Sequence, residues 1–500
     1  MDHRSLWIAT TPETSYPSLQ EDIDVDVAVI GAGITGLTIA YLLIKKGVRV
    51  AVIEANRIAA STSGYTTGKI TSLQGLTYAD LMQEAGEEQA HIFAEANQAA
   101  IERIAMIVEE ERIDCDFRRA PAFTFATSRN DVPAIEAEVE AAQKLDLPVS
   151  FTTDTGLPFR VEGAIRMEDQ AMFHPRKYLL ALAACILRNG GAIYEHTRAT
   201  DVLTDNGCEV ITRHGRVRAG QVVLATQIPF LDRGGFFAKT SPSKSYLLAA
   251  RIEGDLPDGM YLGTGETSHT IRPQTGPEGS WLITGGEDHK VGQDEDTRRR
   301  YDALEAWTRA TFPVREISYS WSGQDYMPVD NVPYIGKLTP MSSRIFVATG
   351  FRKWGMTTGM IAGIILSDLI EGKRHPWLDV YDASRIDITR SAKRFIAENM
   401  NVATRFVWDR ISRLDAGSVD DLIPDSGGIV EIDGTATAAY RDHEGLLHAV
   451  SPTCAHLGCS LSWNTAERTW DCPCHGSRYD VDGHVIQGPS VRNLERRDMG

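Results

Sequence analysis

The chain opens with a strand, a glycine-rich turn, a helix and a second strand in close succession. Residues 25–30 are apolar at most positions, and the turn 31–36 (GAGITG) fits the pattern G-x-G-x-x-G. Apolar residues recur at helical spacing over 37–46, and Gly47 stands where a helix C-terminal cap belongs. Residues 48–53 are almost continuously apolar, as in a parallel strand that is covered on both faces. This order predicts a βαβ unit of an α/β fold.

The glycine turn and the acid that ends the second strand have the chemistry of a dinucleotide site. Gly31 permits the tight turn, Gly33 lets a pyrophosphate approach backbone N–H groups, and Gly36 permits close packing of helix and strand. Glu54 can accept the ribose hydroxyls of an adenosine. An ordinary tight turn is the alternative, but the flanking strands and helix favour dinucleotide binding. No second turn of this kind sits between a strand and a helix, so we expect no dedicated NAD(P)H site.

The middle of the chain alternates helical and strand patterns. The helical patterns cover residues 95–112, 176–188 and 359–371, and the strand patterns cover 222–225, 281–284 and 345–348. This mixture predicts a Rossmann-like α/β nucleotide domain that is interleaved with a sheet-rich second lobe. A Gly-rich loop at 350–358 opens the last helix, whose positive N-terminal end would stabilise an anionic reduced flavin.

Over about residues 24–381 the sequence resembles the D-amino-acid-oxidase-like group of FAD-dependent oxidoreductases. The resemblance rests on VAVIGAGITGLTIAYLL, on VIEA followed by STSGYTTGK, on VVLAT and on IFVATGFRKWGMTTG. It implies that the ADP half of FAD is held by Gly31, Gly33, Gly36 and Glu54. It implies that pyrophosphate and flavin run beside Ser61, Thr62, Thr66, Gly68 and Lys69. It implies that the pyrimidine end of the ring is flanked by Gly350, Trp354, Gly355, Met356 and Thr357.

The same resemblance sets expectations for the chemistry. Relatives that attach FAD covalently use Cys or His in these loops, and neither stands at the matching places, so we expect non-covalent FAD. The resemblance favours a small amine or amino acid that is oxidised to an imine. Lys69 and Arg352 are candidates for binding a substrate carboxylate, with surface or cofactor contact as the alternative. His289 and Lys290 follow a strand and are weaker candidates, with a solvated turn as the alternative.

Four of the seven cysteines and two histidines crowd into one short C-terminal stretch. The stretch contains a C-x-H motif, fifteen intervening residues and a C-x-x-H motif, formed by Cys454, His456, Cys472 and His475. Two Cys and two His can hold one tetrahedral Zn²⁺, yet zinc sites favour C-x2–4-C pairs. The arrangement suits better a cluster with two thiolates on one iron and two imidazoles on the other.

The segments CAHLGC and CPCHGSRYD resemble the Rieske [2Fe–2S] domain, over about residues 427–495. The resemblance implies one iron on Cys454 and Cys472 and the other on His456 and His475. It implies a disulfide between Cys459 and Cys474, hydroxyl donors to the cluster sulfurs at Ser477 and Tyr479, and a covering loop at Gly488 and Pro489. Such donors stabilise the reduced cluster, so we expect a potential in the upper half of about −150 to +300 mV.

These observations predict three segments: an FAD-dependent oxidoreductase domain at 24–384, a helical linker at 385–416 and a small all-β Rieske domain at 417–500. The linker stretch is basic and amphipathic. We expect its apolar face to pack on the oxidoreductase body, with docking to a membrane surface or a partner as the alternative.

Charge and hydropathy limit the partners and the cellular locations that we expect for the protein. The formal net charge of −17 disfavours nucleic-acid binding, because such a surface repels phosphates. No apolar run approaches the ~20 residues that span a bilayer. The first 20 residues lack the patterns of a signal or transit peptide, so we expect a cytoplasmic protein.

Two redox centres in one chain predict a converter from two-electron to one-electron chemistry. We expect oxidation of the amine or amino acid by FAD, then single-electron steps through the cluster to an unidentified acceptor. A flavin oxidase that reduces O2 directly beside a structural cluster is one alternative. A redox sensor or assembly protein without turnover is another. A Rieske oxygenase is disfavoured because no mononuclear iron site of two His and a carboxylate is evident in the body.

Overall fold

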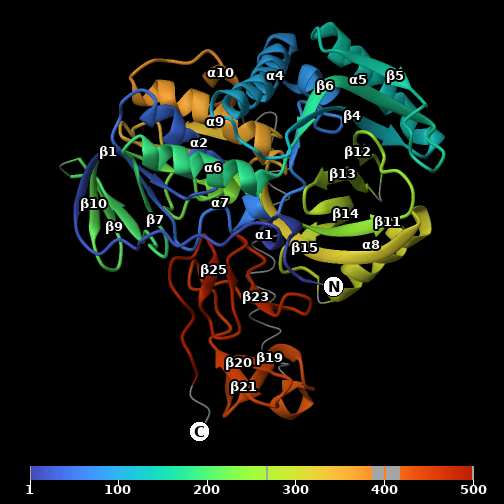
Figure 1. Cartoon of the computed structure of the whole chain (residues 1–500). Coiled ribbons are helices and arrows are strands. Elements are labelled where there is room, and N and C mark those ends of the chain that lie inside the picture. The colour runs from blue at the N-terminus through green and yellow to red at the C-terminus, as the bar shows by residue number, and fades with distance from the viewer. Residues whose placement is uncertain are drawn as a thin grey trace.

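The structure is a computed structural model that describes residues 2–385, 399–400 and 417–497, apart from 206, 266, 267 and 295. The predicted linker 385–416 therefore lies outside the described residues, except for Arg385, Asn399 and Met400. Two large sheets lie side by side under a layer of helices, and the C-terminal segment lies below them (Figure 1).

The first sheet has a parallel centre with the strand order β17-β10-β1-β2-β7. These strands are β1 (Ile23–Ile30), β2 (Val50–Ile53), β7 (Ala192–Tyr194), β10 (Arg216–Leu224) and β17 (Ile345–Thr349). Antiparallel strands extend it: β8 (Asp201–Leu203) and β9 (Cys208–Ile211) beside β10, and β16 (Tyr334–Lys337) beside β17. All of β2 and the last four residues of β1 are buried, which explains their continuous apolar sequence.

Helix α2 (Ile34–Ile44) connects β1 to β2, and every one of its residues is buried. It is apolar all round because α6 (Pro175–Arg188) and α9 (Gly355–Ile370) cover it. Helix α4 (Glu87–Glu110) packs on α9 in turn. The other α-helices whose bounds lie within the described residues are α1 (Leu6–Ala9), α3 (Tyr78–Ala85), α5 (Val132–Lys144), α7 (Phe236–Lys239), α8 (Arg298–Thr311) and α10 (Leu378–Tyr381).

The second sheet has the order β15-β11-β14-β13-β12-β4-β6-β3, with β5 beside β6. Its strands are β3 (Lys69–Ile70), β4 (Arg118–Ala126), β5 (Val149–Thr152), β6 (Gly163–Met172), β11 (Thr240–Ile252), β12 (Met260–Gly263), β13 (Thr270–Gly276), β14 (Gly279–Lys290) and β15 (Val314–Pro328). The prediction that His289 and Lys290 follow a strand is wrong. They still belong to β14, because β11 continues to pair with it there.

The C-terminal segment is built from two small sheets, in which all neighbouring strands are antiparallel except β18 and β19, which are parallel. The first has β18 (Gly417–Ser418), β19 (Ser426–Ile432), β20 (Thr435–Arg441) and β21 (Leu447–Val450), and the second has β22 (Ser462–Asn464), β23 (Thr469–Asp471), β24 (Arg478–Tyr479) and β25 (Val485–Gln487). The predicted fold class, an α/β body with a small all-β domain, is confirmed. Among the described helices, none combines the length and the apolar character needed to cross a bilayer.

Candidate functional site

The turn between β1 and α2 has no room for side chains. Gly31 has a φ of +105°, and a Cβ there would lie 2.5 Å from the carbonyl oxygen of Ala225. A Cβ on Gly36 would lie 1.8 Å from the carbonyl oxygen of Gly31. Only glycine fits either place, so β1, the turn and α2 come together as closely as a dinucleotide site requires.

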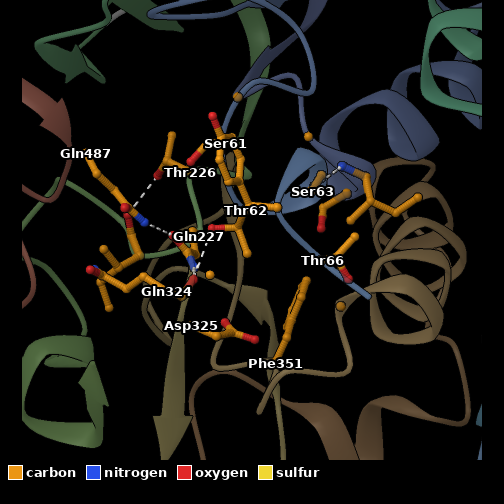
Figure 2. A pocket seen from close by; sticks show the side chains of 18 of the residues that line it. Ser61, Thr62, Ser63, Thr66, Thr226, Gln227, Gln324, Asp325, Phe351 and Gln487 are labelled. Atoms are coloured by element: carbon orange, nitrogen blue, oxygen red, sulfur yellow. Dashed lines mark hydrogen bonds between the residues drawn. The ribbon is translucent and has the colours of Figure 1, made fainter. Parts of the chain in front are cut away.

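A cavity of about 450 Å³ begins at this turn and runs between the two large sheets. Figure 2 shows its polar wall, where side chains from several distant segments point inward. Of the residues that the sequence singled out, the cavity is lined by Gly31, Gly33, Glu54, Ser61, Thr62, Thr66, Lys69, Arg352, Trp354, Gly355 and Met356. Four of the predicted FAD contacts lie outside this lining: Gly36, Gly68, Gly350 and Thr357. The described lining residues include no cysteine or histidine.

Glu54 lies half-buried at one end of the cavity. Its carboxylate accepts the backbone N–H groups of Ala32 at 2.8 Å and Asn56 at 2.9 Å. Burial raises the pKa of this carboxyl, and the two N–H donors oppose the shift. The guanidinium of Arg198 also lines the cavity, and its charge favours the ionised form of Glu54.

The N-terminal segment braces the loop that lines the cavity, which the sequence did not predict. Trp7 is fully buried, and its indole N–H donates to the carbonyl oxygen of Thr66 at 2.6 Å. The hydroxyl of Ser5 donates to the carbonyl oxygen of Gly64 at 2.5 Å. The sequence signal for this contact was a single Trp in a polar N-terminal segment. A single residue has no periodicity, so the sequence could not identify what Trp7 packs against.

The sequence also did not predict a group of polar side chains on the cavity wall opposite this loop. Gln227 donates through its side-chain amide to the carbonyl oxygen of Gln324, and the buried Asp325 follows it in β15. Burial raises the pKa of Asp325, although backbone N–H groups of Tyr326 and Lys353 donate to its carboxylate. The polar pair Gln324–Asp325 within a strand was the sequence signal for this wall.

Lys69 is a buried amine in the lining of the cavity. Its ammonium group donates to the carbonyl oxygen of Tyr261 at 2.6 Å and to the hydroxyl of Thr270. Burial, together with the positive charge of Arg272, lowers the pKa of Lys69 to about 7. The amine can therefore exchange a proton near neutral pH.

The other candidates for substrate contact are placed differently. Arg352 lines the cavity, and its guanidinium donates to the carbonyl oxygen of Asn331 at 2.6 Å. His289 and Lys290 do not line the cavity. The imidazole of His289 instead faces the ring of Tyr246, with ring centroids 5.7 Å apart.

The cysteine–histidine motifs form two matching loops, one between β21 and β22 and the other between β23 and β24. The N–H of Cys454 donates to the carbonyl oxygen of Cys459, and the N–H of Cys472 donates to that of Ser477, both at 2.8 Å. The predicted disulfide between Cys459 and Cys474 is present and joins the two loops.

The donor atoms of these loops fit an iron–sulfur cluster. The thiols of Cys454 and Cys472 are buried and outside any disulfide. Among the residues that the structure describes, the buried Nδ1 atoms of His456 and His475 have no hydrogen-bond partner, a costly state that metal ligation would relieve. Burial lowers the pKa of each imidazole to about 4, which leaves it neutral as a ligand must be.

A single zinc ion fits less well. In the described part of the chain, the metal-ligating side chains gathered within 4.8 Å of one another are Cys459, Cys472 and Cys474. Two of these form the disulfide, and the set contains neither histidine. The two thiols and two imidazoles are thus spread over more space than one tetrahedral ion needs.

The two cluster loops contact residues of the oxidoreductase body. The ring of Phe237 in α7 lies 4.5 Å from that of His456 and 5.4 Å from that of His475, centroid to centroid. The hydroxyl of Tyr326 donates to the carbonyl oxygen of His475 at 2.9 Å. Because Tyr326 adjoins the cavity-lining Asp325, one short stretch of β15 links the cavity to a cluster loop.

Comparison with known families assigns a family to each of the two parts of the chain. A family model described as FAD dependent oxidoreductase matches residues 26–369, and one described as Rieske [2Fe-2S] domain matches residues 412–497. These matches agree with the glycine turn, the cavity and the two cluster loops.

Individual relatives give the same result. The chain is 37% identical, over 99% of its length and 97% of the relative's, to a Bacillus subtilis protein named as the Rieske 2Fe-2S iron-sulfur protein YhfW. It is 23% identical to gamma-glutamylputrescine oxidoreductase of Escherichia coli, over 77% of this chain and 91% of that one. The crystal structure of glycine oxidase from Geobacillus kaustophilus matches with a TM-score of 0.63 and 21% identity, over 73% of this chain and 99% of that one. That likeness concerns the fold alone.

Proposed function

Because the chain belongs to the FAD-dependent oxidoreductases and carries a Rieske [2Fe–2S] domain, we propose that it oxidises a small amine or amino acid and passes the electrons singly to an external acceptor. A bound flavin takes up two electrons from a substrate, whereas a [2Fe–2S] cluster passes one at a time. The family acts on C–N bonds, and gamma-glutamylputrescine oxidoreductase is among the relatives.

One observation carries this proposal: the dinucleotide cavity and the cluster loops share a wall. Tyr326 bonds to the backbone of His475, and its neighbour Asp325 lines the cavity. An enclosed arrangement of this kind suits electron transfer between the two cofactors better than a cluster remote from the cavity would.

The residues of the chain have separate tasks in this proposal. The backbone at Gly31 and Gly33 receives the pyrophosphate, and Glu54 orients the adenosine ribose. The neutral amine of Lys69 accepts a proton as a bound ammonium substrate is prepared for oxidation. Cys454, Cys472, His456 and His475 hold the cluster. We also propose that the protein is cytoplasmic and that its oxidoreductase domain, linker and Rieske domain span residues 24–384, 385–416 and 417–500.

Anaerobic mixing with a panel of amines and amino acids tests the function. An active substrate is expected to bleach the flavin absorbance and to produce the EPR signal of a reduced Rieske cluster. Rapid peroxide release in air without that signal would instead identify an oxidase with a structural cluster. No response to any member of the panel would favour a sensor without turnover.

A cluster-ligand variant provides the control. Cys454→Ser removes one thiolate, so bleaching by the substrate is expected to persist while the EPR signal disappears. A signal that survives in this variant would contradict the ligand assignment and leave the oxidation step itself unaffected.

A further inference from the structure

A segment of the Rieske domain forms part of the dinucleotide cavity. Residues 486–491, which begin within β25 and continue beyond it, line the cavity together with the glycine turn and Glu54. About 430 positions separate this segment from Glu54 along the chain. Figure 2 shows Gln487 reaching in among the side chains of the FAD lobe.

Three contacts attach this segment to the walls of the cavity, and two of them lie at the end where Glu54 lies. The side-chain amide of Gln487 donates to that of Gln227 at 2.5 Å. The amide of Asn56 donates to the carbonyl oxygen of Ile486 at 3.4 Å, and the guanidinium of Arg198 donates to that of Val485 at 3.1 Å. Asn56 is two residues from Glu54, and the charge of Arg198 acts on it. The segment therefore closes the adenosine end of the cavity.

The cluster loops hold the same segment from the other side. The N–H of Ser490 donates to the hydroxyl of Ser477 at 3.0 Å, and both residues are buried. The hydroxyl of Tyr326 lies 3.5 Å from the carbonyl oxygen of Gly488 and bonds to His475 as well. The position of the segment is thus determined by the fold of the cluster loops.

We infer that residues 486–491 of the Rieske domain are a wall of the FAD site and contribute to binding the adenosine diphosphate half of FAD. The Rieske domain would then serve two purposes, holding the cluster and retaining the flavin cofactor. The family's own FAD-binding region ends long before this segment, at residue 369. The inference depends on FAD binding and not on the identity of the substrate.

The full chain with its cluster in place, titrated with FAD after removal of the flavin, tests this inference. Gln487→Ala is expected to raise the Kd for FAD about three- to ten-fold, the effect of losing one hydrogen bond. His484→Ala is the matched control, because His484 lies on the same hairpin, bonds only to Asp480 among the described contacts and does not line the cavity. It is expected to leave the Kd within two-fold.

A double-mutant cycle measures how much the contact between Gln487 and Gln227 contributes to FAD binding. In a Gln227→Ala background, Gln487→Ala is expected to change the Kd less than two-fold, because its partner is already absent. The EPR spectrum of the cluster reports whether the Rieske domain is folded in each variant. Should Gln487→Ala lose its cluster, Gln487→Glu keeps the shape of the side chain and adds a negative charge to the wall of the cavity, which would disfavour a negatively charged cofactor, so its Kd is expected to rise. An unchanged Kd in the cluster-loaded variants would overturn the inference.

Discussion

Lys69 shows how burial alone can prepare a side chain for proton transfer. Its amine is held by a carbonyl oxygen and a hydroxyl, neither of which carries a charge to stabilise the ammonium form. Burial and the nearby Arg272 therefore lower its pKa to about 7. Perturbed groups in cavities are candidates for catalysis, and Lys69 lines the cavity.

Replacing Lys69 tests this role through the pH dependence of the reaction. The neutral amine is the proton acceptor and predominates above pH 7, so kcat/KM is expected to rise with pH through about 7. Lys69→Met is expected to abolish this rise and to lower kcat about 100-fold, the scale of general-base catalysis. Lys177→Met is the control, since Lys177 pairs with Asp116 and Glu278 away from the cavity. An unaltered pH profile in Lys69→Met would assign Lys69 a structural role.

Tyr479 has its hydroxyl 3.2 Å from the sulfur of Cys454. The hydroxyl accepts the N–H of Ala455, so its own proton is free to be donated to the sulfur. Tyr479→Phe is expected to lower the cluster potential by about 20 to 65 mV, the one-electron equivalent of one hydrogen bond. EPR-monitored redox titration measures the shift. Tyr440→Phe, whose hydroxyl bonds to Asp425 in the same domain, is expected to cause none.

At the scale of elements, the approach of α2 to β1 is the contact on which the dinucleotide site depends. The helix starts at Ile34, and the N–H of this residue donates to the hydroxyl of Ser63 at 3.0 Å. The helix, the turn and the cavity loop therefore hold one another in place. A change in the helix–strand distance alters all three.

Gly36→Ala separates these elements. The added Cβ would lie 1.8 Å from the carbonyl oxygen of Gly31, so either the helix or the turn must move. We expect the purified variant to lack FAD, as judged from its visible absorbance. Gly47→Ala is the control: no atom of the described residues lies within 4 Å of the Cβ that it would add, and its φ of +81° costs only about 1–2 kcal/mol. FAD retained in full by Gly36→Ala would contradict this account.

At the scale of the whole molecule, a buried charge network joins the Rieske domain to the body. Lys244 of β11 is fully buried, and its ammonium group lies 2.8 Å from Glu467 and 3.3 Å from Asp471. Arg478 pairs with the same two acids. Burial opposes ionisation of Glu467, yet Arg478 and Lys244 hold its pKa below its usual value. Two cations and two acids therefore balance inside the interface.

Removing one cation tests the strength of this network. Lys244→Met leaves two buried acids with one partner, which is expected to lower the free energy of unfolding by about 3–5 kcal/mol. Denaturant unfolding followed by the visible signal of the cluster measures the loss. Lys45→Met removes the more exposed ion pair with Glu111 and is expected to cost less than about 1 kcal/mol. Equal losses in the two variants would show that the network does not hold the domains together.

Much of the body was predictable because its signals are local. Strand β1, the glycine turn and α2 follow one another directly, so pattern and spacing identify them. The C-x-H and C-x-x-H motifs are equally local, since each lies within one loop. The prediction was wrong where pairing between distant strands decides how far a strand extends. Strand β14 extends to Lys290 because β11 continues to pair with it there.

The sequence by itself determined which cofactors this chain accommodates, since a glycine turn and a set of thiols and imidazoles act through their own chemistry. Only the tertiary structure decided how the two sites meet. Gln487, Phe237 and Lys244 gain their roles from partners hundreds of residues away. Such contacts leave no periodic trace in a sequence, because they depend on how whole domains pack and not on the neighbours of each residue.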